Sequence, residues 1–182
     1  MKKKLTLLIK ASLVMLLAFF YATRSNAQCA PDITFPTITC PADIVQANDA
    51  GVCGAVVTYV TPVGADNCVG PVTTMTAGLA SGATFPIGLT VVTYEVVDGA
   101  GNTTSCSFNV TINDTENPTI SCPADVVVAN DPGVCEKTLT YATPVGIDNC
   151  PASVTALTAG LASGPSFPVG LTTVSYEVTD AS

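Results

Sequence analysis

Short apolar segments alternate with turn-forming residues along most of the chain. Apolar residues with a period of two, or in short β-branched runs, predict strands. The predicted strands are residues 44–47, 55–61, 72–76, 90–97 and 104–112. Turns rich in Gly, Pro, Asn and Asp separate them, at 48–51, 64–67, 81–82 and 98–102. Beyond Ala27 no segment has the periodicity and caps of a helix, so the pattern predicts an all-β protein.

The same pattern of strands and turns occurs twice in the chain. Cys40, Cys53 and Cys68 recur 82 positions later as Cys122, Cys135 and Cys150. Residues 37–100 align without a gap with residues 119–182, and 41 of the 64 aligned positions are identical. The chain therefore contains a duplicated unit. We expect a lead-in at 28–36, a first domain at 37–118 and a second domain at 119–182, truncated at its C-terminal end.

Several strands in each unit, separated by turns, describe a small antiparallel β-sandwich of immunoglobulin-like type. The chain has no Trp, so the buried Trp of antibody domains is missing and the likeness is architectural. The predicted fold is a tandem of two such sandwiches. A domain of this size buries a thin core, which disulfides would reinforce.

The segment that ends at Ala27 predicts a secretory signal peptide. Three lysines at 2–4 are followed by a mostly apolar stretch to Tyr21, and the small residues Ser25 and Ala27 mark a cleavage site. Only residues 11–20 run without a charge, which is too short to span a bilayer. We expect a secreted or cell-surface protein with no membrane insertion after cleavage.

Composition excludes several function classes. The chain has no His, so a His general base, a Ser-His-Asp triad and a His-ligated zinc are all absent. After signal cleavage the chain keeps one basic residue, Lys137, and 14 carboxylates, so its formal charge is −13. Such a surface repels phosphate backbones, so nucleic acid is excluded as a partner. With no Trp to stack on sugars, the carboxylates do not indicate a glycosidase, and we expect no enzymatic activity.

The cysteines are expected to form disulfides, because a secreted chain enters an oxidising compartment. The candidates are Cys40, Cys53, Cys68, Cys106, Cys122, Cys135 and Cys150. The four cysteines of the first unit allow three connectivities. If the first and last strands are neighbours, Cys40 bonds to Cys106 and Cys53 to Cys68. Cys122 would then be single, as would Cys29.

The junction between the units is acidic. Residues 113–118 read Asn-Asp-Thr-Glu-Asn-Pro and are similar to the interdomain linkers that hold calcium in cadherins. Asp114, Glu116 and Asn117 are therefore candidate calcium ligands, with help from a loop residue such as Asp98 or Asp148. The alternative is a solvated linker with no cofactor. Asx residues in the loops at 66–67, 148–149, 98 and 102 favour a turn-capping role.

The motifs together resemble the HYR (hyalin repeat) domain. They are Ile38-Thr39-Cys40-Pro41, Gly51-Val52-Cys53, Asp66-Asn67-Cys68, Phe85-Pro86-Ile87-Gly88, Tyr94, Asp98, Gly101-Asn102 and Cys106-Ser107-Phe108-Asn109-Val110. The second unit matches the pattern as far as Asp180. The resemblance implies an immunoglobulin-like extracellular module associated with adhesion, and it brings no catalytic residues.

Two functions follow as hypotheses. The first is a non-catalytic adhesion or spacer module of a larger secreted or surface protein, whose partner is a protein or glycan on a surface or matrix. The second is a carbohydrate- or protein-binding domain with a ligand site in its loops. Repetition favours the first, because stacked copies extend a protein whereas a dedicated pocket needs only one.

Overall fold

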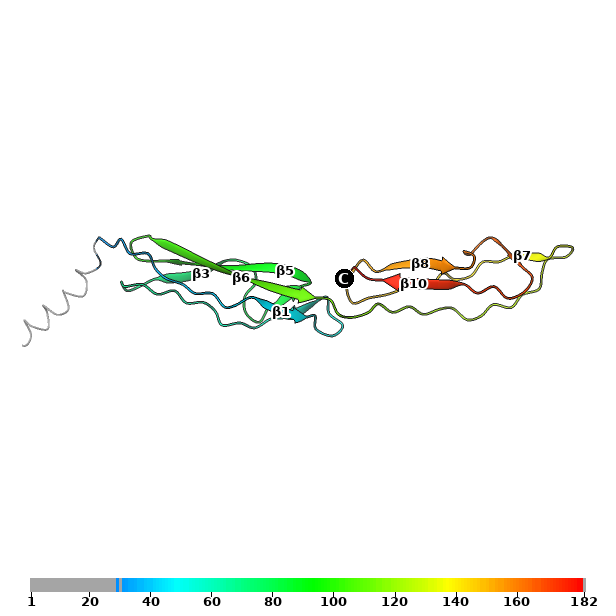
Figure 1. Cartoon of the computed structure of the whole chain (residues 1–182), viewed down its shortest axis with the longest axis horizontal. Coiled ribbons are helices and arrows are strands. Elements are labelled where there is room, and N and C mark those ends of the chain that lie inside the picture. Colours follow the sequence, from blue (N-terminus) through cyan, green and yellow to red (C-terminus); the bar gives the residue numbers. More distant parts are fainter. Residues whose placement is uncertain (1–28, 30, 182) are drawn as a thin grey trace, which may run out of the picture. The chain divides into compact units, whose positions relative to one another are not determined.

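The computed structural model describes Cys29 and residues 31–181. The predicted signal peptide, residues 1–27, lies outside them. The described residues contain strands and no α-helix, and they form immunoglobulin-like β-sandwich repeats (Figure 1), so the predicted all-β class is confirmed. No helix in this part of the chain has the length and apolar character needed to cross a membrane.

The chain divides into two compact units. The first comprises the residues up to Asp43 together with Thr58–Ser81 and Val91–Asn109. The second comprises Ile44–Val57, Gly82–Thr90 and Val110–Ser182.

The first repeat contains six described strands. They are β1 (Ile44–Ala47), β2 (Gly54–Val56), β3 (Val72–Ala77), β4 (Thr84–Pro86), β5 (Gly88–Val97) and β6 (Thr103–Asn113). One sheet has the order β1-β6-β5-β3, and β2 pairs with β4 in a second sheet. β3–β5 and β2–β4 are antiparallel as expected, whereas β1 runs parallel to β6, with Ile44 opposite Val110.

Four of the five predicted strands agree with the structure to within two residues at each end. The prediction of a strand at 55–61 is wrong, because β2 ends at Val56. At Tyr59 the backbone pairs with a side chain instead of a neighbouring strand. The Tyr59 amide donates to Ser81 Oγ at 2.8 Å, and Ser81 Oγ donates back to the Tyr59 carbonyl at 2.8 Å. The three-residue strand β4 was not predicted, since it is too short to show a period and ends in Pro86.

Alternate residues of the two long strands are buried. Val92, Tyr94 and Val96 of β5 are at most 5 % exposed, as are Phe108, Val110 and Ile112 of β6. Phe85 of β4 is completely buried. Burial of every second side chain is what a strand with one face on a core requires.

The second repeat reproduces strands of the first at the spacing that relates Cys40 to Cys122. Its strands are β7 (Glu136–Thr138), β8 (Val154–Ala159), β9 (Ser166–Pro168) and β10 (Ser175–Thr179). β7 pairs with β9 and β8 with β10 in the registers of β2–β4 and β3–β5. The isolated bridge Thr37–Ala65 likewise recurs as Thr119–Ile147. The duplication seen in the sequence is therefore a duplication of structure.

Two strands of the first repeat, β1 and β6, have no counterpart among the described residues of the second. Residues 126–129 correspond to β1 but form no strand, and Val127 is 94 % exposed. β1 pairs with residues 110–113, whose counterparts would lie beyond residue 182 of this sequence. A groove of about 610 Å³ lies in the second repeat, with Tyr141, Phe167 and Val174 in its wall.

A pair of tyrosines joins strands and loops in each repeat. Tyr59 Oη donates to the Leu79 carbonyl at 2.6 Å and lies 3.1 Å from Tyr94 Oη. The counterparts, Tyr141 with the Leu161 carbonyl and with Tyr176 Oη, are at 2.7 and 3.0 Å. Burial and then the hydrogen bond with Tyr94 raise the pKa of Tyr59 to about 12. The hydrogen bond with Tyr176 and then burial raise the pKa of Tyr141 to about 12.

These raised pKa values predict alkaline unfolding. A pKa of about 12 in the folded state, above the ordinary value of 10.0, means that the stabilisation is complete below pH 10 and is lost as the pH rises through 12. Tyr59→Phe should lower the free energy of unfolding by about 1 kcal/mol. It should also remove one of the two late ionisations expected in a tyrosinate absorbance titration. Tyr141→Phe is the matched control for the second repeat, and an unchanged number of late ionisations in both variants would contradict the prediction.

Candidate functional site

Two segments of the first unit bring Asp32 and Asp66 together. The bridge between Thr37 and Ala65, with N–H···O distances of 2.7 and 2.8 Å, aligns the lead-in with the loop that carries Asp66. The disulfide between Cys29 and Cys68 closes the same end, with Cα atoms 5.8 Å apart. As a result, a carboxylate oxygen of each aspartate and Sγ of Cys68 all lie within 4.8 Å of one another.

Each of these carboxylates uses one oxygen to cap a turn. Asp32 Oδ1 accepts from the Thr34 amide at 3.1 Å, and Asp66 Oδ2 accepts from the Cys68 amide at 2.9 Å. The predicted turn-capping role of Asp66 is therefore confirmed. The other two oxygens, Asp32 Oδ2 and Asp66 Oδ1, are buried and have no hydrogen-bond partner among the described residues. A buried charged oxygen without a partner is unfavourable, so this pair requires an explanation.

The second unit repeats the arrangement at Asp114 and Asp148. Asp114 Oδ1 accepts from the Glu116 amide at 3.2 Å, and Asp148 Oδ2 accepts from the Cys150 amide at 3.0 Å. Carboxylate oxygens of the two aspartates and Sγ of Cys150 again lie within 4.8 Å of one another. Asp148 Oδ1 and the amide oxygen of Asn149 are buried, with no hydrogen-bond partner in the described part of the chain.

The structure regroups the predicted calcium ligands. It places Asp114 beside Asp148, one of the two helpers considered from the sequence. Glu116 does not belong to that carboxylate pair, and its Oε1 accepts from the Gly51 amide at 2.8 Å. Asn117 is exposed. The three residues expected to act together are therefore split by local turn geometry.

Asp32 was missed from the sequence. Extending the repeat alignment upstream of Thr37 pairs Asp32 with Asp114 and Pro36 with Pro118. The alignment from which the repeat was recognised began at Thr37, and the lead-in was set apart from the first domain. The upstream extension was the signal that could have located the pair.

Asp98, the other loop residue considered as an additional calcium ligand, caps a turn. It is 7 % exposed, and its carboxylate accepts from the amides of Ala100 and Asn102 and from the Asn102 side chain, at 2.8 to 2.9 Å. Burial raises the pKa of this carboxyl, and the hydrogen bonds from Asn102, Ala100 and Gly101 together outweigh it, so the pKa is lowered. The predicted capping role of Asp98 with Asn102 is confirmed.

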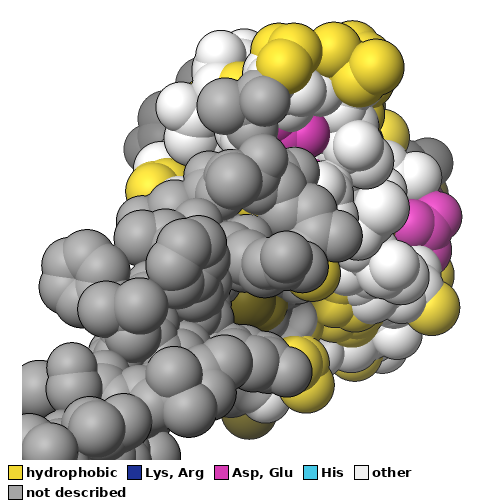
Figure 2. Space-filling model, turned by 90° about the vertical axis from the view of Figure 1, so that its left-hand side faces the viewer, with side chains coloured by type: hydrophobic (Ala, Val, Ile, Leu, Met, Phe, Trp, Pro, Cys, Tyr) yellow, Lys and Arg dark blue, Asp and Glu magenta, His cyan; other side chains and the backbone are white. Residues whose placement is uncertain are grey.

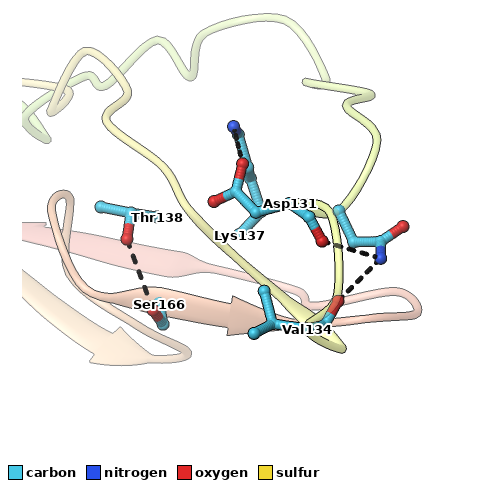
Figure 3. A network of polar contacts seen from close by, with 6 residues as sticks. Asp131, Val134, Lys137, Thr138 and Ser166 are labelled. Atoms are coloured by element: carbon cyan, nitrogen blue, oxygen red, sulfur yellow. Dashed lines mark hydrogen bonds and ion pairs between the residues drawn. The ribbon is translucent and has the colours of Figure 1, made fainter.

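Among the described residues no basic side chain neutralises either aspartate pair. Within the described residues Lys137 is the one Lys or Arg, and Figure 3 shows its ammonium directed at Asp131, with which it forms an ion pair. The end face in Figure 2 shows Asp and Glu side chains and no described Lys or Arg. Two like charges at this spacing repel by roughly 3 kcal/mol at an effective dielectric constant of about 20.

The disulfides differ in part from the expected ones. The expected Cys40–Cys106 bond is present, with Cα atoms 5.7 Å apart. The expected Cys53–Cys68 bond is wrong: Cys68 bonds to Cys29, which was expected to be single, and Cys53 bonds to Cys150, with Cα atoms 4.7 Å apart. Cys53 and Cys68 belong to different compact units. Cys122 and Cys135 are free and exposed.

The fold defines the class of the protein as two disulfide-linked, immunoglobulin-like β-sandwich repeats. The model of the HYR domain family matches residues 31–112 and again residues 113–182, and the chain belongs to this family. The chain is therefore an extracellular adhesion-type module of a secreted or cell-surface protein.

Similar proteins include hyalin. Hyalin of Strongylocentrotus purpuratus is 32 % identical over 154 residues, which is 83 % of this chain and 13 % of that protein. Hyalin of Lytechinus variegatus is 37 % identical over 120 residues, 64 % of this chain and 22 % of that protein. The sushi, von Willebrand factor type A, EGF and pentraxin domain-containing protein 1 of Rattus norvegicus is 30 % identical over 168 residues, 89 % of this chain and 4 % of that protein. The chain thus spans less than a quarter of the length of each.

Proposed function

We propose that the chain is a non-catalytic adhesion or spacer module of a larger secreted or cell-surface protein. The observation that carries the proposal is the Cys53–Cys150 disulfide, which joins a residue of the first HYR segment to a residue of the second. Hydrogen bonds from the Asn149 side chain to the Val52 carbonyl and from the Gly51 amide to Glu116 accompany it. Covalent linkage of consecutive copies suits a spacer that transmits force.

We further propose that the modules are residues 37–118 and 119–182, joined stiffly. The connection at 113–118 is short, contains no Gly and ends in Pro118, so few backbone conformers are accessible to it. The disulfide restricts them further.

The absence of catalytic activity is supported by chemistry. The chain has no His, which removes the most common general base, and six of its eight cysteines are in disulfides and cannot act as nucleophiles. The partner we propose is a protein or glycan on a surface or matrix, bound through loops and strand edges.

The test is to measure retention on cell or matrix surfaces for arrays of one, two and four units. Weak contacts multiplied by linkage should make retention rise steeply with copy number, because the second contact is intramolecular. Equal retention for all three arrays would contradict the proposal. A single unit that binds one sugar tightly on a glycan array would instead support a domain with its own ligand site.

A further inference from the structure

We propose that the turn at residues 130–135 is a covalent docking site for another HYR repeat, whose Asp-Asn-Cys loop forms a disulfide with Cys135. One bond of this kind is present in the structure. Cys53 ends the turn at 48–53 of the first repeat, and it bonds to Cys150, which ends an Asp-Asn-Cys loop. Cys135 is the counterpart of Cys53 in the second repeat, and it is free and exposed. Below, 48–53 and 130–135 are called the docking turns, and 66–68 and 148–150 the acceptor loops.

The first step is that the second docking turn has the geometry of the first, which is already bonded. The Asn48 side chain donates to the Val52 carbonyl at 3.2 Å, and the Asn130 side chain donates to the Val134 carbonyl at 2.7 Å (Figure 3). The single glycine of each turn lies in the left-handed region, with φ of 71° and 82°. The second turn is therefore preorganised for the same contact.

The second step is a backbone acceptor beside the cysteine. In the first docking turn the Val52 carbonyl also accepts from the Asn149 side chain of the acceptor loop, at 3.2 Å. Within the described residues the Val134 carbonyl accepts from Asn130 alone. A carbonyl oxygen has two lone pairs, so Val134 can accept a second hydrogen bond from the Asn of an incoming loop.

The third step concerns the acceptor loops, which share one geometry. The Cys68 amide donates to Asp66 Oδ2 at 2.9 Å, and the Cys150 amide donates to Asp148 Oδ2 at 3.0 Å. Each loop cysteine bonds to a cysteine that precedes its own repeat: the partner of Cys150 lies in the first repeat, and the partner of Cys68 is Cys29, just ahead of residues 31–112. Of the two described docking turns, the second is the one without an acceptor loop.

The bond would form by thiol–disulfide exchange with a small-molecule disulfide as the oxidant. The oxidant first forms a mixed disulfide with the loop cysteine and releases one thiol. The Cys135 thiolate then attacks the sulfur of the loop cysteine, the mixed disulfide breaks, and the leaving thiolate takes up a proton. Overall, two protein thiols are oxidised to one disulfide, and one disulfide of the oxidant is reduced to two thiols. A secreted protein meets such oxidants in the compartment where its disulfides form.

The inference rests on the proposed spacer function, because the bond would continue the linkage of Cys53 to Cys150 into a further repeat. Its test measures a covalent bond and not adhesion. Failure to form the bond would therefore leave the retention experiment unaffected, and equal retention of all arrays would leave the bond unaffected.

The test is to mix two forms of the full chain in a buffer of reduced and oxidised glutathione. The donor form is Cys122→Ala, which leaves Cys135 as its one free thiol. The acceptor form combines Cys29→Ala with Cys122→Ala and Cys135→Ala, which leaves the thiol of Cys68. We expect a disulfide-linked heterodimer whose peptide map contains the Cys135–Cys68 bond.

The matched donor is Cys135→Ala with Cys122 retained, because Cys122 is also free and exposed but lies outside the docking turn. It should give at least about tenfold less heterodimer, since no docking contact raises the effective concentration of its thiol near Cys68. Asn67→Ala in the acceptor should lower the yield with the Cys135 donor roughly fivefold, the effect of one lost hydrogen bond.

Equal yields from the two donors would show that any exposed thiol reacts, and would overturn the proposal. A heterodimer without the Cys135–Cys68 bond would also overturn it. If circular dichroism shows that the acceptor is unfolded, Cys53→Ala replaces Cys29→Ala in it. That acceptor frees Cys150 and keeps the bond of Cys68, and the same difference between the two donors is expected.

Discussion

Replacing Cys40 and Cys106 together by alanine should lower the free energy of unfolding of the first repeat by about 4 kcal/mol. The bond closes a loop with a sequence separation of 66 residues, so its removal restores considerable chain entropy to the unfolded state. A domain of this size has a total stability of roughly 5 to 15 kcal/mol, so the variant should be close to unfolding. Denaturant unfolding followed by tyrosine fluorescence measures the change.

Cys122→Ala is the control for this experiment. Cys122 is the counterpart of Cys40, but it is free and exposed, so its removal breaks no bond and should change stability by less than about 0.5 kcal/mol. A double variant as stable as the wild type would show that the Cys40–Cys106 bond adds nothing, and would contradict the prediction.

The strands were predictable where the two-residue period runs over several positions. The long strands β5 and β6 were located because alternate residues such as Val92, Tyr94 and Val96 are buried on one face. The segment after Val56 was predicted as strand from the same kind of pattern. There the hydroxyl of Ser81, distant in sequence, takes the place of a neighbouring strand, and a local pattern carries no signal for such a contact.

The disulfide pattern was predictable only in part. Cys40 precedes β1 and Cys106 lies within β6, and neighbouring first and last strands were enough to suggest their bond. The bond from Cys53 to Cys150 spans 97 residues and links the two copies, so it cannot be deduced from one copy alone. The bond from Cys68 to Cys29 was missed because Cys29 has no counterpart in the second copy.

The carboxylate pairs show a similar limit. The sequence drew attention to acidic residues near the junction, with Asp148 as a helper. Which carboxylates meet depends on the bridges Thr37–Ala65 and Thr119–Ile147, which are tertiary contacts across 28 residues. Sequence proximity favoured Glu116, whose carboxylate instead binds the Gly51 amide.

Phe85→Ala should be the most damaging single substitution in the core, lowering the free energy of unfolding by about 3 to 5 kcal/mol. Phe85 is the largest of the fully buried side chains, and it lies opposite Ala55, which is also completely buried. Removal of the ring leaves a cavity that neighbouring strands cannot fill without breaking their pairing. The midpoint of denaturant unfolding should fall sharply while the slope stays the same.

Phe167→Ala is the matched comparison, because Phe167 occupies the equivalent position in β9. It lies opposite Lys137 rather than a buried alanine, and it is half-buried in the wall of the groove of the second repeat. Its ring keeps an edge-on contact with Tyr141 at a centroid distance of 6.3 Å. Less apolar area is removed from water there, so the loss should be at most about half of that for Phe85→Ala. Equal losses at the two positions would mean that β4 is no better packed than β9, and would contradict the burial on which the prediction depends.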